Sequence, residues 1–136
     1  MVVAADSSLT TVQQLVRWDP AGAARKELDS RREAHLPPAA VVAAVDGTSG
    51  SIAELLQQWE RPEGSELLGP VPLPPGIRLP HRLDRTQAAE ARRLIIRVPH
   101  HEGMALGRSL KTAISTRAIH KHTAPLRVVL DPVRIG

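Results

Sequence analysis

Apolar and polar residues alternate with two different periods between residues 40 and 131, and these periods predict a mixture of strands and helices. The run Val41–Val45 is apolar throughout, which is typical of a buried strand. After the turn-like residues 46–50 comes a capping box, with Ser51 as the N-cap and Glu54 at the third helical position. The next apolar residues recur at the spacing of one helix face: Ile52, Leu55, Leu56 and Trp59. We therefore expect Trp59 to lie in the core and not to stack on bases.

The middle of the chain is less regular. Residues 66–71 form one possible short strand inside a proline-rich segment, and residues 77–90 have no clear period, which predicts a mobile hairpin loop. The clearest strand covers residues 92–98, because its side chains alternate strictly between two faces. One face is apolar, with Leu94, Ile96 and Val98, and the other carries Arg93, Ile95 and Arg97.

A second amphipathic helix is predicted from about Glu102 to Ile114, with Arg108 and Lys111 on its outer face. Arg117 would fall on the apolar face if this helix continued, so we expect it to fray near residues 115–116. A last alternating strand covers Leu126–Leu130, with Arg127 on its polar side.

The predicted order is therefore strand, helix, strand, strand, helix, strand, which is typical of an α+β, ferredoxin-like domain with two layers. If the apolar faces of the strands pack against the two helices, then Arg93, Arg97 and Arg127 lie on the open face of the sheet or in a groove beside it. An alternative is that these arginines are solvated surface residues, or that they pair with Asp and Glu from residues 1–66.

The first 36 residues follow a different pattern. Residues 2–5 read as a short buried strand, and a helix follows with Leu9, Val12, Leu15 and Val16 as its apolar positions. Asp19 and Pro20 begin another helix, which runs to about Glu33 and is mostly charged. Because these elements bury little by themselves, we interpret residues 1–36 as part of a larger unit and residues 37–136 as a separate domain.

Charge is distributed unevenly along the chain. Residues 1–77 contain 6 Lys+Arg and 10 Asp+Glu, a formal charge of −4, whereas residues 78–136 contain 12 Lys+Arg and 4 Asp+Glu, a formal charge of +8. A basic half of this kind favours a polyanionic partner such as nucleic acid. A GC-rich coding sequence would also enrich Arg, but it would not separate the two signs so clearly.

Several kinds of chemistry are excluded or disfavoured by the residues present. The chain has no Cys, which excludes disulfides, thiolate zinc sites and a cysteine nucleophile. It has no glycine-rich phosphate loop and no carboxylate pair set for acid–base catalysis. The histidine pairs 100–101 and 120/122 lack acidic companions at ligand spacing, so surface histidines are a better interpretation than a metal site. We expect no catalysis and no bound cofactor or metal.

Aromatic residues make up only 1% of the chain, with two Trp and no Phe or Tyr. Proteins that read single strands usually stack bases on exposed aromatic rings, so contacts to backbone phosphates are the better expectation here. Such contacts depend on salt and on DNA shape. The side chains that we expect to make them are Arg93, Arg97 and Arg127 on the sheet, Arg108 and Lys111 on the helix, and Arg78, Arg82 and Arg85 in the loop.

Five segments together resemble a known family. They are residues 12–20 (VQQLVRWDP), residues 27–39 with Glu27-Leu28, Arg31 and the ending LPPA, residues 68–72 (LGPVP), residues 93–97 (RLIIR) and residues 126–132 (LRVVLDP). In this order and spacing they are similar to the C-terminal end of primosomal protein N′, the PriA-type replication-restart DNA helicases, with an actinobacterial character.

The resemblance implies that residues 1–36 are the end of the second helicase lobe and that residues 37–136 are a C-terminal domain similar to ribosomal protein S10. It also implies binding to forks and D-loops, contacts with single-stranded-DNA-binding protein and other primosome proteins, and a cytoplasmic, nucleoid-associated location without a membrane. The ATP, Mg and Zn of the family belong to upstream segments. Alternatives are a module that receives the acidic tail of single-stranded-DNA-binding protein, or an S10-like RNA- or ribosome-associated module.

Overall fold

The structure, a computed structural model, describes residues 2, 4–79, 83–119 and 124–133. Its elements in chain order are α1 (Thr10–Val16), α2 (Pro20–Glu33), β1 (Ala40–Thr48), α3 (Ser49–Gln58), β2 (Glu66–Pro72), α4 (Arg85–Ala89), β3 (Ala91–Pro99), the 3-10 helix η1 (His100–Glu102), α5 (Gly103–Ile119) and β4 (Arg127–Leu130).

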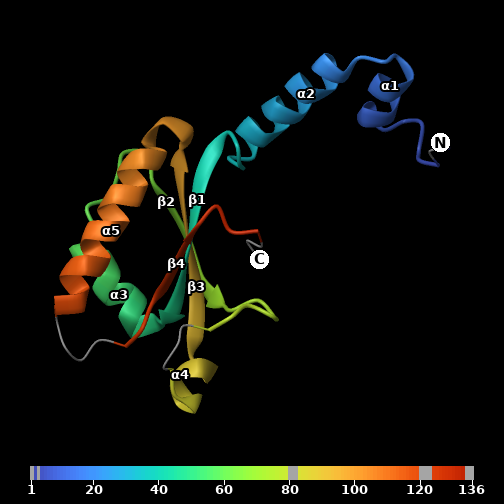
Figure 1. Cartoon of the computed structure of the whole chain (residues 1–136). Coiled ribbons are helices and arrows are strands. Elements are labelled where there is room, and N and C mark those ends of the chain that lie inside the picture. The colour runs from blue at the N-terminus through green and yellow to red at the C-terminus, as the bar shows by residue number, and fades with distance from the viewer. Residues whose placement is uncertain (1, 3, 80–82, 120–123, 134–136) are drawn as a thin grey trace.

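The strands form one four-stranded sheet in the order β2-β3-β1-β4, and every neighbouring pair is antiparallel. This topology and the two helices α3 and α5 on one face of the sheet confirm the predicted α+β fold with two layers (Figure 1). The irregular loop contains one element that the sequence analysis missed, the short helix α4, which begins with a capping box at Asp84 and Gln87.

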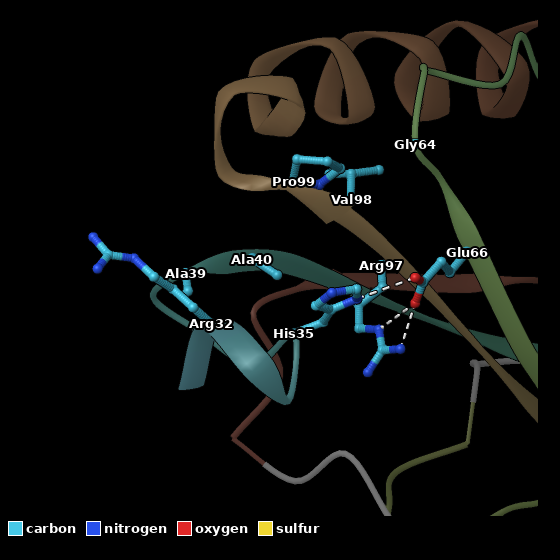
Figure 2. A pocket seen from close by; sticks show the side chains of 9 residues that line it. All are labelled: Arg32, His35, Ala39, Ala40, Gly64, Glu66, Arg97, Val98 and Pro99. Atoms are coloured by element: carbon cyan, nitrogen blue, oxygen red, sulfur yellow. Dashed lines mark hydrogen bonds and ion pairs between the residues drawn. The ribbon is translucent and has the colours of Figure 1, made fainter. Parts of the chain in front are cut away.

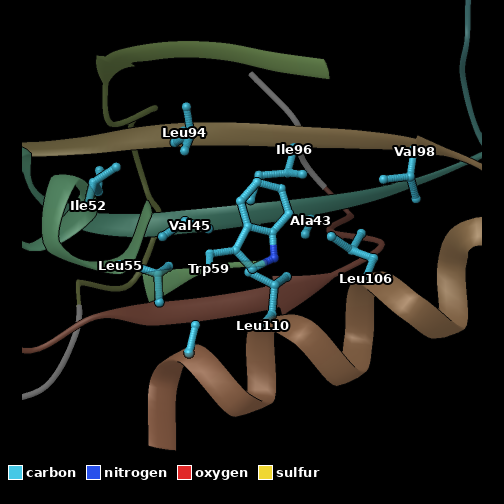
Figure 3. Close-up of a cluster of buried hydrophobic side chains, with 11 residues drawn as sticks. Ala43, Val45, Ile52, Leu55, Trp59, Leu94, Ile96, Val98, Leu106 and Leu110 are labelled. Atoms are coloured by element: carbon cyan, nitrogen blue, oxygen red, sulfur yellow. The ribbon is translucent and has the colours of Figure 1, made fainter. Parts of the chain in front are cut away.

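The main core lies between the sheet and the two helices. Leu94, Ile96 and Val98 of β3 pack there with apolar side chains of β1, α3 and α5, as predicted for that face of the strand (Figure 3). Trp59 lies in the middle of this core with 7% of its surface exposed, and its Nε1–H donates to Ser109 Oγ at 2.8 Å. The prediction of Trp59 as a core residue is therefore confirmed. The opposite face carries a smaller buried cluster of Val42, Ala44 and Ile95.

Helix α3 begins earlier than predicted, and its cap is a different residue. Strand β1 continues through the expected turn as far as Thr48, because Gly47 and Thr48 pair with the first residues of β3. Thr48 is the N-cap, and its side chain accepts from the backbone N–H of Ser51 at 3.2 Å. The prediction of Ser51 as the cap is wrong, since strand pairing holds the chain extended for longer than the local pattern indicates.

Helix α5 also corrects a prediction. It does not fray near residues 115–116 but continues to Ile119, with Arg117 buried on its inner face. The buried guanidinium of Arg117 has partners there: Nε donates to Glu54 Oε2 at 3.1 Å, and Nη2 donates to the carbonyl of Ala124. The charge of Arg117 is tolerated on the apolar face of α5 because Glu54 pairs with it.

The N-terminal helices α1 and α2 extend away from the sheet and its helices (Figure 1). The predicted strand at residues 2–5 is wrong, because the described residues Val2, Ala4 and Ala5 have no strand structure. In the described part of the chain, no helix is long and apolar enough to cross a membrane.

Candidate nucleic-acid interface

Arg93 is not exposed on an open face, so this expectation is wrong. Only 2% of its surface is exposed, and it forms a two-point ion pair with Asp46, its register partner on β1, which is fully buried. Nε lies 2.7 Å from Asp46 Oδ1, and Nη2 lies 2.9 Å from Oδ2. A bidentate geometry of this kind compensates the cost of removing both charges from water. Arg93 therefore has a structural role. This agrees with the alternative prediction that these arginines pair with Asp and Glu from residues 1–66.

Arg97 is also paired, at the edge of the sheet beside the end of α2. Its Nε lies 2.9 Å from Glu66 Oε2, its Nη2 contacts the same oxygen, and Nη1 donates to the carbonyl of Ala34 at 3.2 Å. His35 Nδ1 lies 3.1 Å from Glu66 Oε1. Figure 2 shows His35, Glu66 and Arg97 together in a pocket that Ala39, Ala40 and Pro99 also line.

This network lowers the pKa of Glu66 below its ordinary value of 4.5. The main cause is the hydrogen bond from Arg97, with a smaller contribution from His35. The carboxylate is thus held in its charged form, and the positive charge of Arg97 is largely neutralised where it stands. An incoming phosphate would have to compete with Glu66 for Arg97.

Arg127 lies on the same face of the sheet as Asp46, which is its register partner on β1. Both carboxylate oxygens of Asp46 are engaged by Arg93, and Arg127 instead donates Nη1 to the carbonyl of Arg78 at 2.9 Å. This contact brings the loop before α4 against β4. The Arg78 side chain is exposed, and within the described residues it forms no ion pair.

Arg108 and Lys111 lie on the exposed surface of α5 and form no ion pair within the described part of the chain. The buried face of the helix is formed by Leu106, Leu110, Ala113 and Arg117. Since a helix turns once in about 3.6 residues, Arg108 points away from the sheet, whereas Lys111 lies to one side of the helix, at a groove that β4 also lines. Their position on the outer face is as predicted, and α5 contains no Asp or Glu that could neutralise them.

Of the remaining sequence candidates, Arg85 lies in α4, just before β3 begins. Arg85 is exposed on the first turn of α4, and Arg82 lies outside the described residues. Sequence reasoning missed Arg92, which is half-buried at the start of β3 and donates Nη1 to the carbonyl of Ala91 at 3.1 Å. The alternation of that strand places Arg92 on the same side as the core residues Leu94, Ile96 and Val98, so the pattern gave no signal for it.

Four of the cations that the sequence analysis singled out form two groups on different layers. We call Arg78 and Arg127 the sheet-face cluster and Arg108 and Lys111 the helix cluster. Arg93, Arg97 and Arg117 belong to neither, because an acidic residue pairs with each of them. His100 and His101 lie in η1, no group of three potential metal ligands occurs among the described residues, and His120 and His122 lie outside them.

Comparisons with known proteins match the whole chain. Residues 32–133 match the model of the primosomal protein N C-terminal domain family. The probable replication restart protein PriA of Mycobacterium leprae is 43% identical over 136 residues, and the protein of the same name from Mycobacterium tuberculosis is 40% identical over 143 residues. All of this chain is covered in both cases, but it spans only about a fifth of either relative, 21% and 22%.

These matches agree with the order of elements and with the segments that suggested the resemblance. The family model begins within α2 and ends just after β4, so it includes the whole sheet with both covering helices. The chain therefore belongs to the primosomal protein N C-terminal domain family and corresponds to the C-terminal part of a replication restart protein.

Proposed function

We propose that this chain binds branched or forked DNA through backbone phosphates and in this way helps a replication restart protein to act at stalled forks. The observation that carries the proposal is the helix cluster: two exposed cations on a helix without acidic residues, neither of which forms an ion pair with a described residue. Family membership supports the partner, since the relatives are named as replication restart proteins.

The expected mode of DNA binding follows from the aromatic and basic residues of the domain. Trp59 is buried, and the domain formed by residues 37–136 contains no other aromatic residue. Bases therefore find no aromatic ring to stack on in this part of the chain, while the other tryptophan, Trp18, is exposed just after α1 and away from the helix and sheet-face clusters. Arginine and lysine contacts to phosphate supply the affinity at these clusters. Binding of this kind depends on ionic strength and on the shape of the DNA more than on its sequence.

The test is the affinity of the chain for a forked duplex across a series of salt concentrations. We expect affinity to fall as salt rises, and we expect Lys111→Ala to reduce the slope of log K against log salt by about 1 because one phosphate contact is lost. Gln57→Ala, an exposed neutral residue on the neighbouring helix α3, is the control and should leave the slope unchanged. Affinity that is absent, or that does not respond to salt, would contradict the proposal.

A second candidate is supported by a groove between α5 and β4. Apolar groups of Leu110, Ile114, Val128 and Leu130 line it, and Lys111 lies at its margin. Such a groove with a lysine at its margin fits an acidic peptide, and the acidic tail of single-stranded-DNA-binding protein is the peptide that the family resemblance suggests. Titration with that peptide, using the wild-type chain and Lys111→Glu, separates the two functions. Binding of the peptide that Lys111→Glu weakens, without any binding of forked DNA, would favour the second candidate.

A further inference from the structure

We propose that this domain contacts two separate DNA segments at once, one on each of its opposite faces. The inference rests on the proposed function, because it assumes that the free cations bind phosphate. It goes further by assigning the helix cluster and the sheet-face cluster to different arms of a branched molecule.

The sheet-face cluster lies on the face of the sheet that α3 and α5 do not cover. Val128 packs against the main core, and successive residues of a strand point to opposite faces, so Arg127 points away from the helices. The register agrees, because its partner Asp46 has the same parity as Val42 and Ala44 of the second buried cluster. The hydrogen bond from Arg127 to the Arg78 carbonyl places the second residue of the cluster beside the first.

The helix cluster faces the opposite direction. Leu106, Leu110 and Ala113 of α5 pack onto the sheet, and Arg108 lies on the far side of the helix from them. Arg108 also lines a groove with Thr112 and Thr116, which are one and two turns further along α5, and the segment after α3 contributes Glu60 and Arg61 to the same groove. The row on α5 presents one guanidinium and two hydroxyl groups, which are suitable donors to phosphate oxygens.

The two clusters are separated by the whole thickness of the domain. A helix with its side chains is about 10–12 Å across, and the sheet lies behind it. Arg93, on the same face as Arg127, and Arg117, on the inner side of α5, do not connect the two clusters, because both are buried and paired with acidic residues. A straight duplex lies against one face and does not reach the other. Two arms that diverge from a branch point can lie against both, which would make a fork a better ligand than a linear duplex.

Site-specific cross-linking tests the assignment, and the natural absence of cysteine makes every introduced thiol unique. A photoreactive group is attached to Thr112→Cys beside the helix cluster or to Leu79→Cys beside Arg78, and each protein is bound to a fork whose arms carry different labels. We expect the two positions to cross-link to different arms. The matched control is Ser30→Cys, which is exposed on α2 and should label neither arm selectively.

Charge reversal supplies a second readout that does not depend on cross-linking. Arg108→Glu with Lys111→Glu, or Arg78→Glu alone, should lower the affinity for a fork by tenfold or more, because two-point attachment is lost. Binding to a short linear duplex should fall only by about a factor of two, since the other face remains. Arg17→Glu with Arg25→Glu on α1–α2 reverses two further exposed arginines and should preserve the preference for forks.

The outcomes separate this inference from the proposed function. Cross-links from both positions to the same arm, or equal losses for fork and linear duplex, would overturn the two-face model while DNA binding stands. Position 112 labelling no arm, together with its protection by an acidic peptide, would assign the helix face to a protein partner and would also overturn it. The absence of salt-dependent fork binding would overturn both proposals.

Discussion

Arg93, paired with Asp46, has a different role in the structure from the one that the sequence predicts. In sequence Arg93 is a cation on the polar side of a strand, whereas in the structure its guanidinium is buried against the two oxygens of Asp46. A buried ion pair contributes little net stability compared with a well-packed apolar pair, but removing one partner leaves the other charge without compensation.

Asp46→Asn should therefore destabilise the domain strongly although it preserves the volume of the side chain. We expect a loss of about 3–5 kcal/mol in the free energy of unfolding, because Arg93 is left charged and buried. Urea denaturation measures this loss. The control is Asp29→Asn, which removes an exposed pair with Arg32 and should cost less than about 1 kcal/mol. Similar small losses in both variants would contradict the role assigned to the buried pair.

At the level of elements, Glu54 explains two of the differences from the predicted fold. The local pattern Ser51-x-x-Glu54 fits a capping box, but β1 extends to Thr48 and takes the cap position from Ser51. Glu54 is then free to pair with Arg117 of α5, and this pair allows α5 to continue to Ile119. The first outcome depends on the pairing of β1 with β3 and the second on the contact between α3 and α5, and both contacts lie beyond the reach of a local pattern.

Thr48→Ala tests the cap that the structure assigns. It removes the acceptor for the N–H of Ser51, and we expect it to lower the free energy of unfolding by about 1 kcal/mol. Ser49→Ala, an exposed change one residue later in the same helix, should have almost no effect. Chemical denaturation of both variants provides the comparison, and an equal loss for the two would count against Thr48 as the cap.

At the level of the whole molecule, one polar network joins α2 to the domain. Arg97 of β3 reaches both Glu66 of β2 and the carbonyl of Ala34 just after α2, and His35 reaches the same carboxylate (Figure 2). The orientation of the N-terminal helices relative to the sheet is therefore linked to the ionisation of Glu66.

The pH dependence of this network has a definite sign. The pKa of Glu66 is lower in the folded chain than its ordinary value of 4.5, so its contribution to stability is present above pH 4.5 and is lost as the pH falls through the folded value. Arg97→Gln should raise the pKa of Glu66, as measured by NMR titration of its carboxyl carbon. His35→Gln should raise it less, because His35 is the smaller cause. A Glu66 pKa that Arg97→Gln leaves unchanged would contradict this account.

Much of the fold is predictable from the chain because it depends on periodicity. The alternation of Leu94, Ile96 and Val98 identified the core face of β3, and the spacing that ends at Trp59 identified the buried face of α3. The proposed site is less predictable. Arg108 and Lys111 could be placed on the outer face of their helix, whereas the partners of Arg93 and Arg97 are 47 and 31 residues away in sequence.

The sequence alone determined the order of strands and helices, the two-layer fold and the excess of positive charge in the second half, because hydrophobic periodicity and composition are local properties of a chain. Only the tertiary structure decided which of those charges remain available. Whether an arginine is free depends on the strand register and on the distance to a carboxylate, and folding brings Asp46, Glu54 and Glu66 from the acidic half against arginines of the basic half. That pairing leaves cations that form no ion pair with a described residue on two opposite faces of the domain, although Arg127 is half-buried and donates to the carbonyl of Arg78.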